Sequence, residues 1–495
     1  MKILSKHGDE FRILLLPNEK IERGDYILVE DVREKRALIL QVYDETYLDS
    51  PGMEEEMLRD ELFRDEKGQM LDPYNLRSIS YLIKDARVLK CKVRASVENG
   101  KISSNVSWVP SRVHSKVTRM PYEDLFKIIG KRGRKIRIGT TSTGDEFVIN
   151  AEDIDGRLTI ITGKKEAGKS HLAKLLVAGL LDHGAYVIVF DINDEYSGLS
   201  FLKDGGPSRY ISKIRVLEPG VNLKFTLKYV GKIVFMDVLQ HVLDTPGASF
   251  REFLRIWDYL ESRGQLNMRS LYECILRWKC NEMVRDALLS RYYTLASSSL
   301  FTDIEPKGTK IEELYRESTE GTAFIISLGK TSPITRRIVV EIILSKLLRL
   351  LEERLIPPTF LIAEEAHLYL RETYWEDLVT RMRHFGIFTI FVTNQPDALG
   401  ASIYRQADNI FLYNFTNEKD LDMISQASVT DSETIKSIVK MLPPHYCLVI
   451  GKVVSDLPIV VKVSEAPFET LGYTKRFFKP IENKVMDSTN KYCQI

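Results

Sequence analysis

The segment 163–170 reads Gly-Lys-Lys-Glu-Ala-Gly-Lys-Ser and fits the pattern G-x-x-x-x-G-K-[ST]. A strand-like apolar run, 158–162, precedes it, and an apolar-periodic segment typical of a helix, 171–183, follows it. In that order, backbone N–H groups and the positive end of the helix dipole converge on one anion. A chance glycine loop in an α/β sheet is the alternative, which the flanking strand and helix disfavour. The motif predicts an α/β domain that binds a nucleotide phosphate.

Within this loop, we expect Lys169 to reach the β- and γ-phosphates of ATP and the Ser170 hydroxyl to ligate Mg²⁺. The other residues expected to contact the nucleotide are Gly163, Lys164, Lys165, Glu166, Ala167, Gly168 and His171.

The length and composition indicate a multidomain protein. A chain of 495 residues, 44% hydrophobic and 28% charged, is expected to form about two to four domains. No apolar run approaches the length of a membrane span, and the first ten residues lack the apolar segment of a signal peptide. The five cysteines are scattered without a C-x-x-C pair, which favours reduced thiols. We therefore expect a cytoplasmic protein without a membrane partner.

Charge is distributed unevenly, although the formal net charge is only +1. The segment 54–66 is mostly acidic, and Lys127–Arg137 is strongly basic. The basic run fits a solvated linker or a phosphate-binding patch equally well.

Two patterns divide the chain. Residues 1–115 contain short alternating apolar segments that predict a small β-barrel, interrupted by a charged, helical insert near 52–66. From Asp155 onward strands alternate with helices, which predicts a mostly parallel sheet. The expected strands are 158–162, 185–190, 322–328, 358–363, 387–393, 408–413 and 446–451.

We therefore expect an α/β, RecA-like phosphate-loop ATPase core in two parts, 116–234 and 321–470. Helical periodicity with few strand signals predicts a helical insertion at 235–320. Residues 471–495 are polar and predict a C-terminal tail.

Two adjacent carboxylates end the strand expected at 358–363. In ATPases of this type, one acidic residue holds hydrated Mg²⁺ and the next polarises the attacking water. We assign Glu364 to the metal and Glu365 to the water. The alternative is an acid pair that caps a helix N-terminus.

Polar residues flank the strand at 387–393. Gln395, just after it, is expected beside the γ-phosphate, although a loop amide that satisfies backbone groups fits the same position. Arg383, and less strongly Arg381, precede the strand and are expected to act as an arginine finger on a neighbouring subunit's ATP. Ordinary surface arginines are the alternative.

Arg157, before the first core strand, is expected to stack on the base or touch a phosphate, unless it is a plain strand-entry charge. Asp191 and Glu195 follow the second strand, and either orient Mg²⁺ and water or cap the next segment.

With these motifs in their order, the chain resembles the HerA family of archaeal hexameric ATPases, relatives of the FtsK and conjugation-type DNA pumps. The resemblance covers nearly the whole chain: it includes the barrel, Arg157, the phosphate loop and several later sequence blocks. These blocks are 191–196, 321–328, 364–367, 383–386, 393–396, 449–452 and 457–462. It implies that Ile459 and Val460 lie against a nucleotide.

Three departures from the family pattern fit a diverged paralogue. Lys164–Ala167 replaces a glycine-rich stretch, Glu364 stands where such pumps often have Asp, and Asn394-Gln395-Pro396 replaces a Gln-Arg-Pro ending.

The resemblance implies a homohexameric ring that uses ATP and Mg²⁺ to translocate double-stranded DNA. It also implies a NurA-type nuclease partner in DNA end resection and recombinational repair. Two alternatives remain open: a pump for another polymer, of secretion, pilus or conjugation type, and an ATP-stabilised scaffold ring for a nuclease or defence effector.

Overall fold

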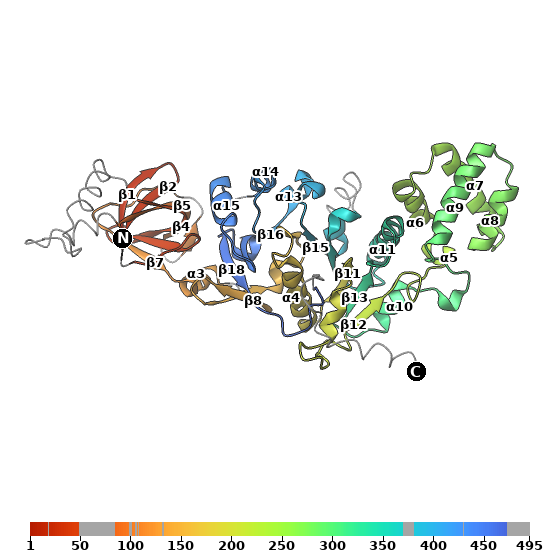
Figure 1. Ribbon diagram of the computed structural model, residues 1–495, viewed down its shortest axis with the longest axis horizontal. Coiled ribbons are helices and arrows are strands. Elements are labelled where there is room, and N and C mark those ends of the chain that lie inside the picture. The colour runs from red at the N-terminus through yellow and green to blue at the C-terminus, as the bar shows by residue number, and fades with distance from the viewer. Residues whose placement is uncertain are drawn as a thin grey trace, which may run out of the picture.

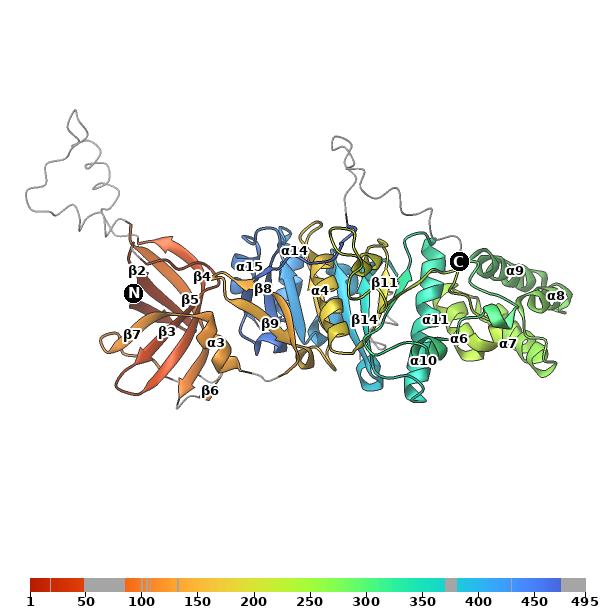
Figure 2. The ribbon, with the colours of Figure 1, turned by 90° about the horizontal axis from the view of Figure 1, so that it is seen from below.

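The computed structural model describes residues 1–17, 19–48, 85–98, 101–103, 106, 108–130, 133–369, 381–428 and 430–472. The molecule is elongated, with an antiparallel sheet domain at one end, a large α/β sheet in the middle and a helical bundle at the other end (Figures 1 and 2). The insert predicted near 52–66 and the tail after Gly472 lie outside the described residues. No helix in the described ranges is both long and apolar enough to cross a membrane.

The N-terminal domain is one curled antiparallel sheet of seven strands. Its order is β1-β2-β5-β4-β3-β7, with β6 beside β5. These strands are β1 (Lys2–His7), β2 (Glu10–Leu15), β3 (Tyr26–Asp31), β4 (Arg36–Tyr47), β5 (Arg87–Glu98), β6 (Lys101–Ser103) and β7 (Ser115–Met120). Alternate residues of β2, such as Phe11 and Ile13, are buried in its core.

The predicted barrel is therefore found as a partly open one. The edge strands β1 and β7 approach each other, but the described residues form no ladder between them. The domain extends to Met120, beyond the predicted boundary at 115, because β7 pairs with β3 over its whole length.

The core sheet has eleven strands in the order β12-β13-β11-β14-β15-β10-β16-β17-β18-β8-β9. Its parallel part comprises β12 (Ile214–Leu217), β13 (Ala323–Ser327), β11 (Tyr186–Asp191), β14 (Thr359–Glu364), β15 (Ile387–Thr393), β10 (Thr159–Thr162) and β16 (Asn409–Tyr413). Its antiparallel part adds β17 (Tyr446–Gly451), β18 (Ile459–Val463), β8 (Lys135–Thr141) and β9 (Glu146–Asn150).

Each of the seven predicted strands is present to within one residue at either end. The α/β prediction is confirmed, with a sheet that is parallel on one side and antiparallel on the other. The basic run Lys127–Arg137, expected as a solvated linker or a phosphate-binding patch, overlaps the end of α3 (Tyr122–Ile129) and the start of β8.

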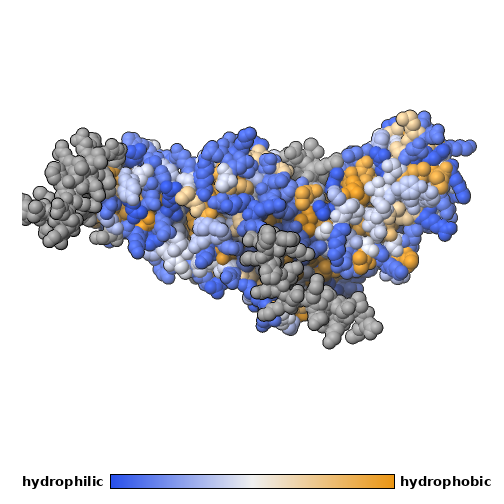
Figure 3. Space-filling model, in the orientation of Figure 1, coloured by the Kyte–Doolittle hydropathy of each residue, from blue (hydrophilic) through white to orange (hydrophobic). Residues whose placement is uncertain are grey.

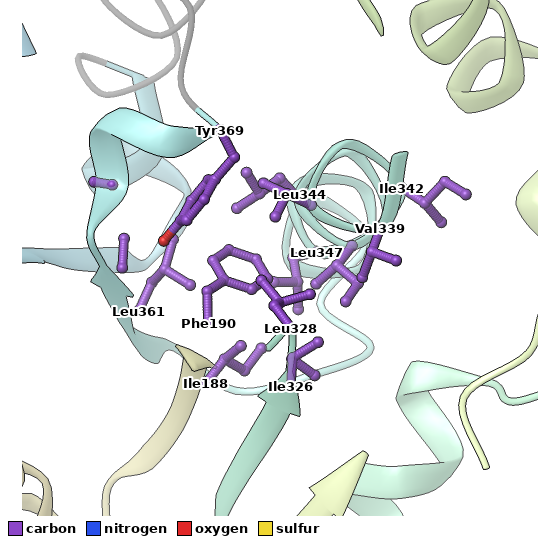
Figure 4. Packing of buried hydrophobic residues seen from close by; sticks show 14 of the residues in the cluster. Ile188, Phe190, Ile326, Leu328, Val339, Ile342, Leu344, Leu347, Leu361 and Tyr369 are labelled. Carbon is purple, nitrogen blue, oxygen red and sulfur yellow. The ribbon is translucent and has the colours of Figure 1, made fainter. Parts of the chain in front are cut away.

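Helices cover both faces of the core sheet. Helix α4 (Lys169–Asp182) packs on one face, where Gly179 allows close approach because a Cβ there would lie 2.3 Å from Ile136 Cγ2. The other face is covered by α11 (Pro333–Glu352), α13 (Ala401–Gln406), α14 (Glu418–Ala427) and α15 (Ser432–Val439). Figure 4 shows Phe190 and Ile326 facing Val339 and Leu347 of α11.

A helical insertion connects β12 to β13. It comprises α5 (Leu227–Val230), α6 (Lys232–Asp237), α7 (Gly247–Ser262), α8 (Met268–Arg277), α9 (Glu282–Ser297) and α10 (Ile311–Arg316). Phe235 and Phe253 pack against the buried Trp257, so the aromatic residues form a core within the insertion. The face in Figure 3 is mostly hydrophilic, with apolar residues gathered on this insertion, where Leu276 and Met283 are exposed.

Candidate nucleotide-binding site

The predicted phosphate loop joins β10 to α4. Gly168, at the N-cap of α4, has φ 109°, and a Cβ there would lie 3.1 Å from His445 Nδ1, so both conformation and space favour glycine. Lys169 is buried, its Nζ donates to the Lys164 carbonyl (2.9 Å), and burial lowers its pKa. The N-terminus of α4 and this ammonium thus lie together, as anion binding requires.

The loop has few glycines, but this does not prevent its fold. Lys164, Lys165 and Glu166 project into solvent, and Ala167 is small enough to be buried. Glu166 adopts φ 61°, a conformation that glycine would take with less strain. The replacement of glycines therefore changes the outer surface of the loop.

Ser170 and Glu364 form the candidate metal site. The Ser170 hydroxyl donates to Glu364 Oε1, and the Tyr196 hydroxyl donates to Glu364 Oε2 (2.6 Å). Burial raises the pKa of Glu364 to about 7, although both hydroxyls oppose the shift. These oxygen donors fit Mg²⁺, which usually takes one or two protein ligands and completes its shell with phosphate oxygens and water.

Glu365 points elsewhere because its backbone is left-handed, with φ 46°. Its Oε2 lies 3.5 Å from His367 Nδ1, and it is buried without a hydrogen-bond partner within the described part of the chain. His367 Nδ1 also lies 3.1 Å from Thr393 Oγ1. Burial lowers the pKa of His367, against the effect of Glu365. Glu365 therefore keeps an acceptor oxygen that suits a water molecule.

Gln395 lies at the same edge of the sheet. Thr162 and Thr393 are opposite each other in the β10–β15 pair, so both strands end beside the phosphate loop. The Gln395 N–H donates to Thr393 Oγ1 (3.0 Å), and its side chain is exposed. This position keeps its predicted role as a sensor geometrically possible.

The three predicted arginines lie at the opposite edge. Arg157 precedes β10 and donates to the Asp153 carbonyl (2.9 Å). Arg381 and Arg383 precede β15 and are exposed, and Arg381 lies 5.8 Å from the Phe385 ring centroid. Within this chain, none of them is brought to the phosphate loop, so contact with a nucleotide would require another subunit.

Ile459 and Val460 lie in β18, on the antiparallel side of the core sheet. Both are buried in β18, and Val460 packs so close to Gly24 of the barrel that an added Cβ would lie 2.8 Å from Val460 Cγ2. The contact with a nucleotide that the resemblance implies for these two residues stays a prediction. The next segment does approach the loop: the Ser464 carbonyl lies 2.7 Å from His171 Nε2, and burial lowers the pKa of His171.

Asp191 caps the following segment, one of its two expected roles. Its carboxylate accepts from the N–H groups of Glu195 (3.2 Å) and Tyr196 (2.8 Å), and burial raises its pKa to about 6. Glu195 pairs with the buried Lys174 (2.6 Å). Tyr196 and His367 lie inside the blocks 191–196 and 364–367, but the sequence assigned them no role. Their contacts with the acid pair are visible only in the fold.

The parallel sheet, the phosphate loop and the paired hydroxyl and carboxylate define a phosphate-loop nucleotide-binding fold. Residues 136–347 match the family model described as "Helicase HerA, central domain", so this part of the chain is similar to that domain.

Solved structures share this fold. VirB4 of Thermoanaerobacter pseudethanolicus is 17% identical, with a TM-score of 0.51 over 68% of this chain and 98% of that chain. The bacterial conjugative coupling protein TrwBdeltaN70 is 13% identical, with a TM-score of 0.52 over 72% of this chain and 94% of that chain. No curated protein matches the chain.

Proposed function

We propose that the chain is an ATPase that translocates double-stranded DNA as a homohexameric ring. The observation that carries this proposal is the grouping of Lys169, the Ser170–Glu364 pair and Glu365 at the end of β10 and β14. The HerA-like core supports a motor role for this site.

In the proposed reaction, water attacks the γ-phosphorus of ATP, a new P–O bond forms, and the bond to the β–γ bridging oxygen breaks. Ser170 and Glu364 would hold Mg²⁺, and the bound ion would neutralise phosphate charge. Glu365 orients the water through its unpartnered oxygen and accepts its proton. Lys169 stabilises the phosphoryl oxygens.

A ring explains why the arginines lie away from the loop of their own subunit. A residue that acts in trans must face outward from the opposite side, as the exposed Arg383 does, with Arg381 and Arg157 near the same edge. In the proposed ring, Arg383 of one subunit completes the site of the next.

Double-stranded DNA is the proposed substrate, and a NurA-type nuclease is the proposed partner at the barrel, in end resection for recombinational repair. A near-neutral chain is compatible with this role, because a ring needs basic residues only where its channel touches phosphates.

The test is ATP hydrolysis by the purified chain with and without linear duplex DNA. We expect DNA to accelerate turnover and Lys169→Ala to abolish it, whereas Lys228→Ala, at an exposed lysine of the helical insertion, keeps most activity. Turnover that is indifferent to DNA contradicts the translocase proposal.

A pump for another polymer is the second candidate, because VirB4 and a conjugative coupling protein share the fold. It predicts that a secretion or conjugation partner, and not free duplex DNA, accelerates hydrolysis. A scaffold ring is separated from both by Glu365→Gln, which would leave the biological function of a scaffold intact.

A further inference from the structure

The phosphate loop is held from outside by residues at the ends of two neighbouring strands. The Lys164 N–H donates to the Asn414 carbonyl, the His445 N–H donates to the Ala167 carbonyl, and the Tyr413 hydroxyl donates to the Gly168 carbonyl, each at 3.1 Å. Tyr413 ends β16, Asn414 follows it, and His445 precedes β17. The backbone of the loop is thus hydrogen-bonded at three positions to residues at the end of β16 and the start of β17.

Asn414 also holds the end of helix α15. Its side-chain amide is mostly buried and donates to the carbonyls of Lys440 (3.1 Å) and Leu442 (2.9 Å), which follow the helix. Asn414 therefore connects the end of α15 to the phosphate loop: its side chain binds the residues after α15, and its backbone carbonyl binds the loop.

The opposite end of α15 is fastened to the barrel. Arg94 of β5 is almost buried; it donates to Asp431 Oδ2 (2.7 Å), the Thr434 hydroxyl (2.6 Å) and the Gln41 side chain (2.9 Å). Asp431 is the N-cap of α15 and accepts from the Thr434 N–H (2.9 Å). Burial alone would raise the pKa of Asp431, but Arg94 and Thr434 hold it below its ordinary value. The N-terminus of α15 is therefore stabilised by the guanidinium of Arg94, which belongs to the barrel.

Further contacts keep this junction rigid. Lys92 pairs with Glu433 of α15 (2.9 Å), and the Pro458 carbonyl of the core accepts from Tyr26 (2.8 Å) and Gln41 (2.7 Å) of the barrel. In Figures 1 and 2, α15 lies at the end of the core that faces the barrel. With Ile435, Ile438 and Val439 buried, α15 is a short helix fixed on one side and at both ends.

We propose that Arg94 and Asn414 are positioning residues that couple the barrel to the phosphate loop through α15. Seating of the barrel on α15 sets the position of Asn414, and Asn414 sets the backbone at Lys164, which changes the affinity for nucleotide. This inference rests on the proposed nucleotide site. A continuous series of contacts, from Arg94 through α15 and Asn414 to Lys164, would carry the coupling between the barrel and that site.

The experiment compares Arg94→Leu, Asn414→Ala and their combination. Asp431→Asn is a milder variant, because Asn still caps a helix but no longer pairs its charge with Arg94. The matched control is Arg87→Leu: Arg87 lies on the same strand, but its partner Glu45 (2.8 Å) is inside the barrel. Hydrogen exchange at the Lys164 N–H and the Kd of a fluorescent ATP analogue are the two measurements.

We expect Arg94→Leu, Asp431→Asn and Asn414→Ala each to speed exchange at Lys164 and to weaken nucleotide binding about threefold to tenfold. The double variant should bind the ATP analogue no more weakly than the single variant with the higher Kd. Arg87→Leu should have the Kd and the exchange rate of wild type. The proposal would be overturned if folded Arg94→Leu and Asp431→Asn showed the exchange rate and Kd of wild type. It would also be overturned if Arg87→Leu had effects as large as theirs. Because exchange is measured without nucleotide, failure of the ATPase proposal would instead appear as a wild-type chain that does not turn over ATP.

Discussion

Glu364 is the residue where stability and proposed function conflict most clearly. A carboxylate buried between two hydroxyls is costly when charged, and the rise of its pKa to about 7 expresses that cost. Charge on this carboxylate is nevertheless what a Mg²⁺ ligand needs. The site therefore carries a local cost in stability that ligand binding would offset.

Replacing Glu364 with Gln should make the metal-free protein more stable at pH 8 while lowering ATP turnover by about 100-fold or more. The sign follows from linkage: an acid with a raised folded-state pKa loses stability as the pH rises from its unfolded value toward 7. The gain in Tm over wild type, measured in EDTA, should thus shrink between pH 8 and pH 5.5. The exposed Glu261→Gln should show no such gain. A Glu364→Gln protein less stable than wild type at pH 8 would argue against this electrostatic reading.

At the scale of elements, motifs with a strong local pattern were predictable. The phosphate loop, the acid pair and the buried parallel strands each have a distinctive composition within a few residues. Strands β8 and β9 were not, since Lys135–Thr141 is charged on one face and is stabilised as a strand only by pairing with β18 and β9. Strand β12 is short and held by β13, which lies more than a hundred residues later.

Site residues divide in the same way. Lys169 and Ser170 were predictable because the phosphate-loop motif fixes their spacing, and Glu364 because an acid pair ends a buried strand. Tyr196 and His367 depend on contacts between segments distant in sequence or on a left-handed turn at Glu365, which no local pattern signals. Ile459 and Val460 are buried strand residues, and composition alone cannot distinguish an apolar strand from an apolar ligand contact.

The packing of α4 on β8 provides a test at this scale. Gly179→Val should destabilise the protein by about 1–3 kcal/mol, because the new side chain meets Ile136 at a distance that requires backbone movement. Chemical denaturation measures the change. Gly247→Ala, where an added Cβ has only the tip of Arg251 within 4 Å, is the control and should be nearly neutral. Equal stability of the Val variant and wild type would mean that α4 is not seated as described.

At the scale of the whole molecule, the site is proposed to be shared between subunits. Arg383 lies on the edge of the sheet away from the phosphate loop, so it should serve a neighbour and not its own chain.

Mixed rings test this arrangement. Arg383→Ala subunits and Glu365→Gln subunits should each be nearly inactive, and mixing them should restore part of the ATP turnover, since some interfaces then combine an intact finger with an intact acid. Subunit exchange must be demonstrated by a labelled pair. Mixed rings without any recovery would exclude Arg383 as a trans-acting residue.

The proposed motor can be observed by electron microscopy of the Glu365→Gln protein with ATP, Mg²⁺ and linear duplex DNA, because slowed hydrolysis should retain the loaded complex. We predict a six-subunit ring with duplex DNA through its central channel and nucleotide between adjacent subunits. A complex that stays monomeric, or a ring whose channel never contains DNA, would contradict the translocase function.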